Sequence, residues 1–216
     1  FSFNFGLLYH TNISDNLELW SSLTYIPETD FVSENSRNIA TVLQLPTGNL
    51  LELDGRDIVV GNTDFTFPSQ LSIGAGIGLS KKWFVGGEFS KQKTSNFSNR
   101  TFELENVIFE DASKFRFGGF YIPDYNSLNS YLKRIVYRTG VRYEKTGLNL
   151  NTESINEFGM SFGIGLPLRG GLSSANIGLE VGKRGTTNSN LIQENFINLQ
   201  LSLSLGDIWF QKRKYN

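Results

Sequence analysis

The 216 residues are enough for one large all-β domain, and 22 Gly, 18 Phe, 8 Tyr and 3 Trp are typical of strands and of aromatic side chains at a membrane surface. The chain has no Cys and only one His, His10, which excludes disulfides, thiolate chemistry and a His-rich metal site. A formal net charge of -1 gives no reason to expect nucleic acid as a partner, and no apolar run is long enough for a transmembrane helix.

Apolar residues alternate with small or polar ones along most of the chain, and this period of two predicts β-strands. About eleven spans show the pattern, each close to the roughly 9 to 11 residues that cross a membrane as a strand. The span from Leu50 is the weakest, and the one from Arg100 is long and bent or bulged. In chain order they are about Ser2 to His10, Asn16 to Ile26, Asn38 to Leu45, Leu50 to Val60, Thr66 to Ser80, Trp83 to Lys93, Arg100 to Ile122, Arg134 to Lys145, Glu157 to Leu166, Ser174 to Lys183 and Asn195 to Leu205.

The side chains between the apolar ones are mostly Gly, Ser and Asn, whereas a soluble sandwich turns a more charged set to water. The pattern therefore predicts an antiparallel transmembrane β-barrel, with lipid outside and a polar lumen inside. Residues 1–205 are expected to form the wall, and residues 206–216 a tail on the periplasmic side. The residues expected to face lipid share one parity: Phe158, Phe162, Ile177, Leu179, Val181, Leu199, Leu201 and Leu203.

The links between spans are of two kinds. Ser80 to Lys82 and Pro167 to Leu172 are short, whereas Pro27 to Arg37 and Arg184 to Ile192 are long and polar. Bacterial barrels place short turns in the periplasm and long loops outside. An odd number of spans counted from a periplasmic C-terminus puts Phe1 outside, so further strands are expected before it.

Several segments resemble Bacteroidota members of the FadL/TodX-like outer-membrane transport family, mainly over the last hundred or so residues. The segments that carry the resemblance are Gly118 to Ser127, Arg134 to Gly140, Ile155 to Gly159, Gly182 to Thr187, Glu194 to Phe196 and Trp209 to Tyr215. The resemblance implies a barrel of about fourteen strands with an N-terminal plug, in the outer membrane of a Gram-negative bacterium.

Two functions follow from these patterns. The resemblance implies passive uptake of hydrophobic small molecules such as fatty acids, with lipid and lipopolysaccharide around the barrel. The alternative is a structural or docking subunit of a larger outer-membrane protein complex, which would not transport and would bind other outer-membrane proteins. The sequence does not separate the two.

A group of charged residues lies between the bulky residues of the strands and is expected to face the lumen. These candidates are Glu88, Arg116, Arg138, Arg142, Glu144 and Glu180. An Arg facing lipid at the midplane would cost about 2 to 4 kcal/mol, so inward placement is a physical requirement of a barrel. Inside, these charges form either a substrate path or a structural salt-bridge network.

Aromatic residues near the predicted strand ends are expected at the two lipid interfaces, where rings with a polar edge are favoured. They are Trp83, Tyr121, Tyr143, Trp209, Phe210 and Tyr215.

Motifs for catalysis or cofactors are weak. The acid pairs Glu103 with Glu105 and Glu110 with Asp111 are more typical of solvated loops than of acid/base catalysis. Asp54 to Asp57 lacks the ligand spacing of a calcium loop. The Gly residues from Gly74 to Gly78 lack the helix of a nucleotide site and, like Gly159 to Gly165, are expected to leave room inside for a plug or ligand. We expect no enzyme activity, no cofactor and no metal.

Overall fold

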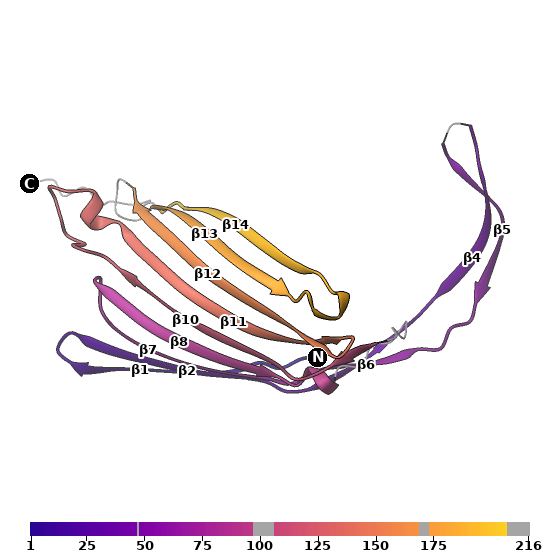
Figure 1. The fold of residues 1–216 in the computed structure, drawn as a ribbon, viewed down its shortest axis with the longest axis horizontal. Helices are drawn as coiled ribbons and strands as arrows, with labels where there is room; N and C mark the ends of the chain where they lie inside the picture. Colours follow the sequence, from indigo (N-terminus) through magenta and orange to yellow (C-terminus); the bar gives the residue numbers. More distant parts are fainter. Residues whose placement is uncertain (47, 97–105, 169–172, 207–216) are drawn as a thin grey trace, which may run out of the picture.

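A computed structural model describes residues 1–46, 48–96, 106–168 and 173–206, and within these ranges the chain is almost entirely antiparallel β-structure (Figure 1). The strands are β1 (Phe5–Ser14), β2 (Leu17–Ile26), β3 (Thr29–Ser33), β4 (Arg37–Gln44), β5 (Leu50–Ile58), β6 (Thr63–Phe67), β7 (Gln70–Leu79), β8 (Trp83–Gln92), β9 (Val107–Phe109), β10 (Ala112–Tyr121), β11 (Val136–Leu150), β12 (Glu153–Pro167), β13 (Ser174–Gly185) and β14 (Gln193–Ser204). Short 3-10 turns are η1 (Thr94–Asn96), η2 (Leu132–Arg134) and η3 (Asn188–Asn190). None of these turns, within the part of the chain that is described, has the length and apolar character to span a bilayer.

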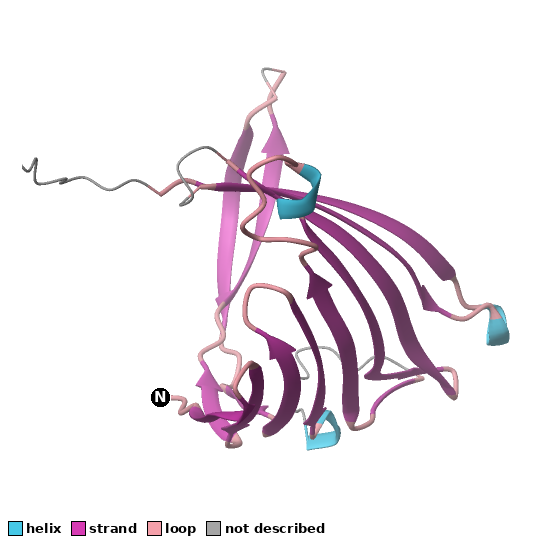
Figure 2. Ribbon diagram, turned by 90° about the vertical axis from the view of Figure 1, so that its left-hand side faces the viewer, coloured by secondary structure: helices cyan, strands magenta, loops and turns pink. Residues whose placement is uncertain are grey.

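One curved sheet of ten strands contains most of the chain, in the order β1-β2-β7-β8-β10-β11-β12-β13-β14, with β9 pairing to β11. The sheet is one layer thick: Figures 1 and 2 show no helix or second sheet against its faces. Buried apolar side chains are correspondingly few in the described ranges, with Ile122 and Ile135 each 6% exposed. The predicted all-β antiparallel fold is confirmed.

The two faces of the sheet differ in chemistry, as the alternation predicts. Register places Phe89, Phe115, Tyr143 and Phe158 side by side on one face, which we call the apolar face. The residues predicted to face lipid share this face through the β12–β13 and β13–β14 ladders; Phe162 is 50% exposed and Leu201 69%. A contiguous apolar surface of this kind on a single-layer sheet requires an apolar environment or a partner.

A long hairpin leaves the sheet between β2 and β7. The β2–β7 ladder continues into the two-stranded ladder β3–β6 and then into β4–β5, which projects far beyond the sheet (Figure 1). Pro27 and Pro68 lie at the interruptions, where the missing N–H groups are compatible with a break in the ladder. At the tip the Leu45 N–H donates to the Asn49 carbonyl, and Gly48 adopts a φ of 85°, which favours glycine.

This hairpin differs from the predicted wall. Asn38 to Leu45 and Leu50 to Val60 were expected to pair with the other spans, yet β4 and β5 pair with each other, outside the main sheet. The bent span from Arg100 divides into β9 and β10, with residues 97–105 outside the described ranges. Alternation specifies which face a side chain takes, and it carries no information on which strand lies alongside.

The long strands β11 and β12 are joined by a two-residue turn. Asn151 and Thr152 have φ values of 50° and 70°, the two positive values that a tight hairpin of right-handed twist requires. The outer strands β1 and β14 do not pair with each other, so in the described ranges the sheet is open along two edges.

The backbone approaches closely at Gly119 on β10. A Cβ added there would overlap the Phe84 carbonyl on β8, whereas a Cβ at Gly6 on β1 meets nothing within 4 Å. We therefore expect Gly119→Ala to destabilise the folded form by about 1 to 3 kcal/mol through overpacking. Gly6→Ala is the matched control and should leave stability unchanged. The measurement is the temperature at which the heat-modifiable band on an electrophoresis gel is lost, and equal temperatures for the two variants would contradict the register.

Candidate functional site

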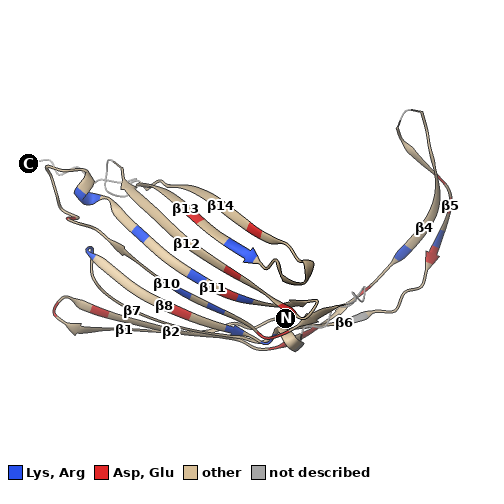
Figure 3. Ribbon diagram, viewed as in Figure 1, with Lys and Arg blue, Asp and Glu red and all other residues tan. Residues whose placement is uncertain are grey.

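The charged candidates lie on the face opposite the apolar one, which we call the polar face. Arg116 on β10 stands between Glu88 on β8 and Arg142 on β11 in the ladder. Arg138 and Glu144 have the parity of Arg142, and Glu180 joins the same face through Ser161. Figure 3 shows that basic and acidic residues lie on many of the neighbouring strands of the sheet. The structure thus places the predicted charges on a single surface.

The centre of the polar face is an ion-pair cluster around Arg142. Its Nε lies 2.6 Å from Glu180 Oε1, its Nη2 binds Glu157 Oε1, and its Nη1 is 3.8 Å from Glu144 Oε2. Glu144 also binds Lys114 at 2.8 Å. The guanidinium lies 5.7 Å from the ring centre of Phe196, within range of a cation–π interaction. One arginine therefore connects strands β11, β12 and β13.

Glu157 is the buried acid of this cluster and was missed in the sequence. Its side chain is 2% exposed and bridges Arg142 and Arg184. The signal was present, because Glu157 directly precedes the outward Phe158 and so has the parity of the other charges. Lys114 and Arg184, also missed, occupy the same ladder row as Glu144 and Glu157.

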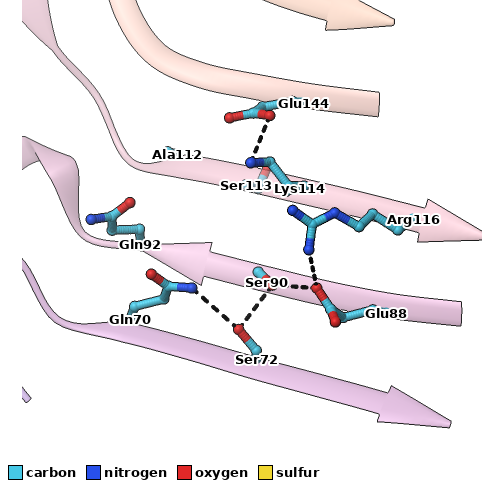
Figure 4. Close-up of a pocket in the computed structure, with 10 residues that line it drawn as sticks. All are labelled: Gln70, Ser72, Glu88, Ser90, Gln92, Ala112, Ser113, Lys114, Arg116 and Glu144. Carbon is cyan, nitrogen blue, oxygen red and sulfur yellow. Dashed lines mark hydrogen bonds and ion pairs between the residues drawn. The ribbon is translucent and has the colours of Figure 1, made fainter. Parts of the chain in front are cut away.

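A second polar group lies on β7, β8 and β10. Arg116 Nη1 is 2.6 Å from Glu88 Oε1, and the Ser90 hydroxyl also donates to Glu88, at 3.2 Å. Ser90 in turn is 2.9 Å from the Ser72 hydroxyl (Figure 4). These residues line an open hollow of about 120 Å³. Because the side chains mostly bind one another, the hollow offers few unsatisfied groups to a ligand.

Aromatic side chains cover several glycines of the polar face. The Phe84 ring occupies the space where side chains at Gly76 and Gly86 would lie, and Phe196 does the same over Gly182. The Phe84 ring stacks on Phe120, with centroids 6.1 Å apart. The expected room for a plug or ligand is thus absent at Gly76, whereas at Gly163 an added Cβ would have nothing nearer than 3.5 Å.

The predicted interface aromatics that are described lie on the apolar face. Trp83 and Tyr121 are directly opposite each other at one end of the sheet, and Tyr137 extends this row onto β11. Tyr143 lies toward the other end, opposite Phe115. Trp209, Phe210 and Tyr215 fall outside the described residues.

The acid pair Glu110 and Asp111, just before β10, binds side chains of β8, η1, β11 and β12. Glu110 accepts hydrogen bonds from Asn149 Nδ2 at 2.8 Å and from the Ser154 hydroxyl at 2.9 Å. The Ser95 hydroxyl donates to Asp111 at 2.7 Å, and Lys91 lies 3.2 Å from it. The Ser95 hydrogen bond, followed by Lys91, lowers the pKa of Asp111 below its ordinary value. Glu103 and Glu105 lie outside the described residues.

The segment from Asp54 to Asp57, considered above as a calcium loop, lies on strand β5. Asp57, on β5, accepts a hydrogen bond from Asn38 Nδ2 at 2.8 Å across the hairpin. No cluster of three or more His, Asp or Glu side chains suited to a metal ion occurs among the residues the structure describes.

Comparison with known protein families shows to which family the chain belongs. The family model of BamG matches residues 1–216, the whole chain. The chain belongs to the BamG family. It is a protein of the bacterial outer membrane. The family that matches is BamG, not the FadL/TodX-like family of the sequence resemblance. A comparison with curated proteins found no match.

Among solved structures, this BamG family member is similar to the CymD monoaromatic hydrocarbon channel. The two share 15% sequence identity with a TM-score of 0.47, over 84% of this chain and 46% of the channel. The chain therefore spans about half the length of the channel it matches.

The buried position of Glu157 yields a stability prediction. Glu157→Gln leaves Arg142 and Arg184 without their shared acid, so we expect a loss between the roughly 1 kcal/mol of an exposed ion pair and the roughly 3 kcal/mol of a buried one. Glu88→Gln breaks the more exposed Arg116 pair and is expected to cost less. Thermal unfolding of the two variants in detergent measures the difference, and an equal or larger loss for Glu88→Gln would contradict it.

The lowered pKa of Asp111 predicts a pH dependence. The ionised carboxylate favours the contacts of Asp111 with Ser95 and Lys91, so its contribution is present above the ordinary Asp pKa of about 4 and is lost as the pH falls through the lowered pKa of the folded state. The Ala112 N–H donates to Thr94 Oγ1 at 2.9 Å, so its protection from hydrogen exchange measures how well the contacts next to Asp111 are formed. Its protection factor should fall as the pH drops below about 4 in the wild type.

Variants separate the causes of this dependence. Asp111→Asn should abolish the pH dependence, and Ser95→Ala should weaken it more than Lys91→Gln does, because the Ser95 hydrogen bond is the largest favourable contribution. An unchanged profile in Asp111→Asn would assign the titration to another group.

Proposed function

We propose that this protein is a structural and docking subunit of a larger outer-membrane assembly, with the BAM complex as its partner. The observation that carries the proposal is the β4–β5 hairpin. A two-stranded hairpin is marginally stable alone in water, and this one extends beyond the sheet with exposed Leu43, Leu51 and Leu53. Such a hairpin is suited to bind another protein, and the BamG family name supports the BAM complex as that protein.

The polar face supports the same proposal. Its charges bind one another around Arg142, and Phe84 covers the glycine-lined stretch of β7 and β8. This favours the structural salt-bridge network over a substrate path. We further propose that the sheet is part of a closed barrel, because unpaired backbone groups along β1 and β14 would each cost several kcal/mol in lipid. The apolar face with Trp83, Tyr121 and Tyr143 would then contact lipid and lipopolysaccharide, and the polar face with its six predicted charges would line the lumen.

Passive uptake of hydrophobic small molecules such as fatty acids is the second candidate. It is supported by the open space at Gly163, beside a hollow of about 330 Å³. The lining of that hollow joins the polar side chains of Arg138, Asn176, Gln200 and Ser202 to Ile177 and two glycines, which suits a ligand with polar groups better than a bare hydrocarbon chain.

The docking test uses the full-length protein purified from native outer membranes in mild detergent. Leu43 and Leu51 face each other across the hairpin, and changing both to Asp should lose co-purification of the BAM complex by at least about tenfold, because the apolar contact is replaced by charge. Gln44→Asp, which adds one charge at the neighbouring position, is the control. Heat-modifiable mobility should stay unchanged in both variants.

Gly163→Trp separates the two candidates. Filling this space should leave co-purification of the BAM complex and fatty-acid uptake by cells as in the wild type if the protein docks. Loss of uptake with an intact complex, together with full co-purification by the double Asp variant, would overturn the docking proposal in favour of transport.

A further inference from the structure

Arg138, on β11, differs from the other strand-borne cations of the polar face. Arg116, Arg142 and Arg184 each lie against a carboxylate, and Lys114 binds Glu144. Within the described ranges no carboxylate lies within 4 Å of the Arg138 guanidinium. Its Nη1 instead donates to the neutral Asn176 Oδ1 at 2.8 Å. A charge held in a barrel wall ordinarily has a counter-charge or marks a functional site.

The space beside Arg138 is kept open by glycines. The guanidinium lies over Gly165, where a Cβ would come within 2.9 Å of Nη1. At Gly163 and Gly178 an added Cβ would meet nothing closer than 3.5 Å and 3.8 Å. Register places Arg138, Gly163 and Gly178 in one row of the polar face, so three neighbouring strands contribute one guanidinium and no side chain above it.

The hollow formed in this way has a volume of about 330 Å³, and its other polar lining residues are Asn176, Gln200 and Ser202. The volume is near the lower end of ligand pockets, which begin at about 300 Å³. Amide and hydroxyl groups suit a ligand with hydroxyls rather than a hydrocarbon chain. The site thus combines one cation, neutral hydrogen-bonding groups and free space.

We propose that this hollow binds a small polar carboxylate, such as a hydroxy acid or sugar acid, with Arg138 holding the carboxylate. The planar guanidinium fork matches the two oxygens of a carboxylate, and Nε and Nη2 are not used by Asn176. A single cation neutralises a monovalent anion, whereas a phosphate dianion would call for further cations. Gln200 and Ser202 would bind the hydroxyls. The proposal is independent of docking to the BAM complex.

The test measures the reaction of arginine with phenylglyoxal in the purified full-length protein, with modified residues located by mass spectrometry. Arg138 should react rapidly, and sodium glucuronate should slow its reaction at least about tenfold while glucose, which lacks the carboxylate, does not. Arg116, paired with Glu88, is the internal control, and its rate should be unaffected by glucuronate. An Arg138 rate that glucuronate leaves unchanged, or an Arg138 that is unreactive from the start because another acid of the protein holds it, would overturn the proposal.

Calorimetric titration with glucuronate provides a second measurement. Arg138→Gln should weaken binding by at least about tenfold, since a charge-assisted bidentate contact is lost. Gly163→Trp should abolish binding by filling the hollow. Arg116→Gln, which has the same change of charge, should bind like the wild type, and an equal loss in Arg116→Gln would show that general electrostatics rather than a site is responsible.

Discussion

The structure depends on one constraint: a sheet of a single layer has no interior of its own. In a sandwich or an α/β protein, one side of each strand is satisfied by a neighbouring layer. Here both surfaces must be satisfied by what surrounds the sheet, so the apolar face requires an apolar environment or a partner, and the polar face requires its own ion pairs and water. The adjacent residues Glu157 and Phe158 on β12 illustrate this: Glu157 lies on the polar face and Phe158 on the apolar face.

Alternation was sufficient to predict the two faces, because a one-residue shift in register would move every side chain of a strand to the opposite face. The placement of Arg142 and Phe162 on opposite faces follows directly from it. Alternation did not predict which strands pair with each other. Residues 38–60 have the same alternation as wall strands, and only the ladder from β2 through β3 shows that they form a hairpin of their own.

The sequence predicted the charged residues of the polar face but not its aromatic residues. Phe84, Phe120 and Phe196 lie on the polar face, where the alternation alone predicts small or polar side chains. Glycines on the neighbouring strands could have indicated these aromatic residues, because a glycine leaves room for a ring. Phe84 on β8 occupies the space that side chains at Gly76 and Gly78 on β7 would take, so small and large residues must be compared across neighbouring strands and not only along one strand.

The uneven distribution of side-chain contacts across the sheet has a mechanical consequence. Ion pairs connect β8, β10, β11, β12 and β13 on the polar face, whereas on the same face the β2–β7 ladder places Trp20 opposite Gly76 and Ser22 opposite Gly74, with no ion pair between these two strands in the described ranges. We therefore expect resistance to bending to be greater on the β8–β13 side, and flexing of the sheet to concentrate around β2 and β7. These are the two strands from which the long hairpin extends, so a force applied to that hairpin enters the wall at its most compliant part.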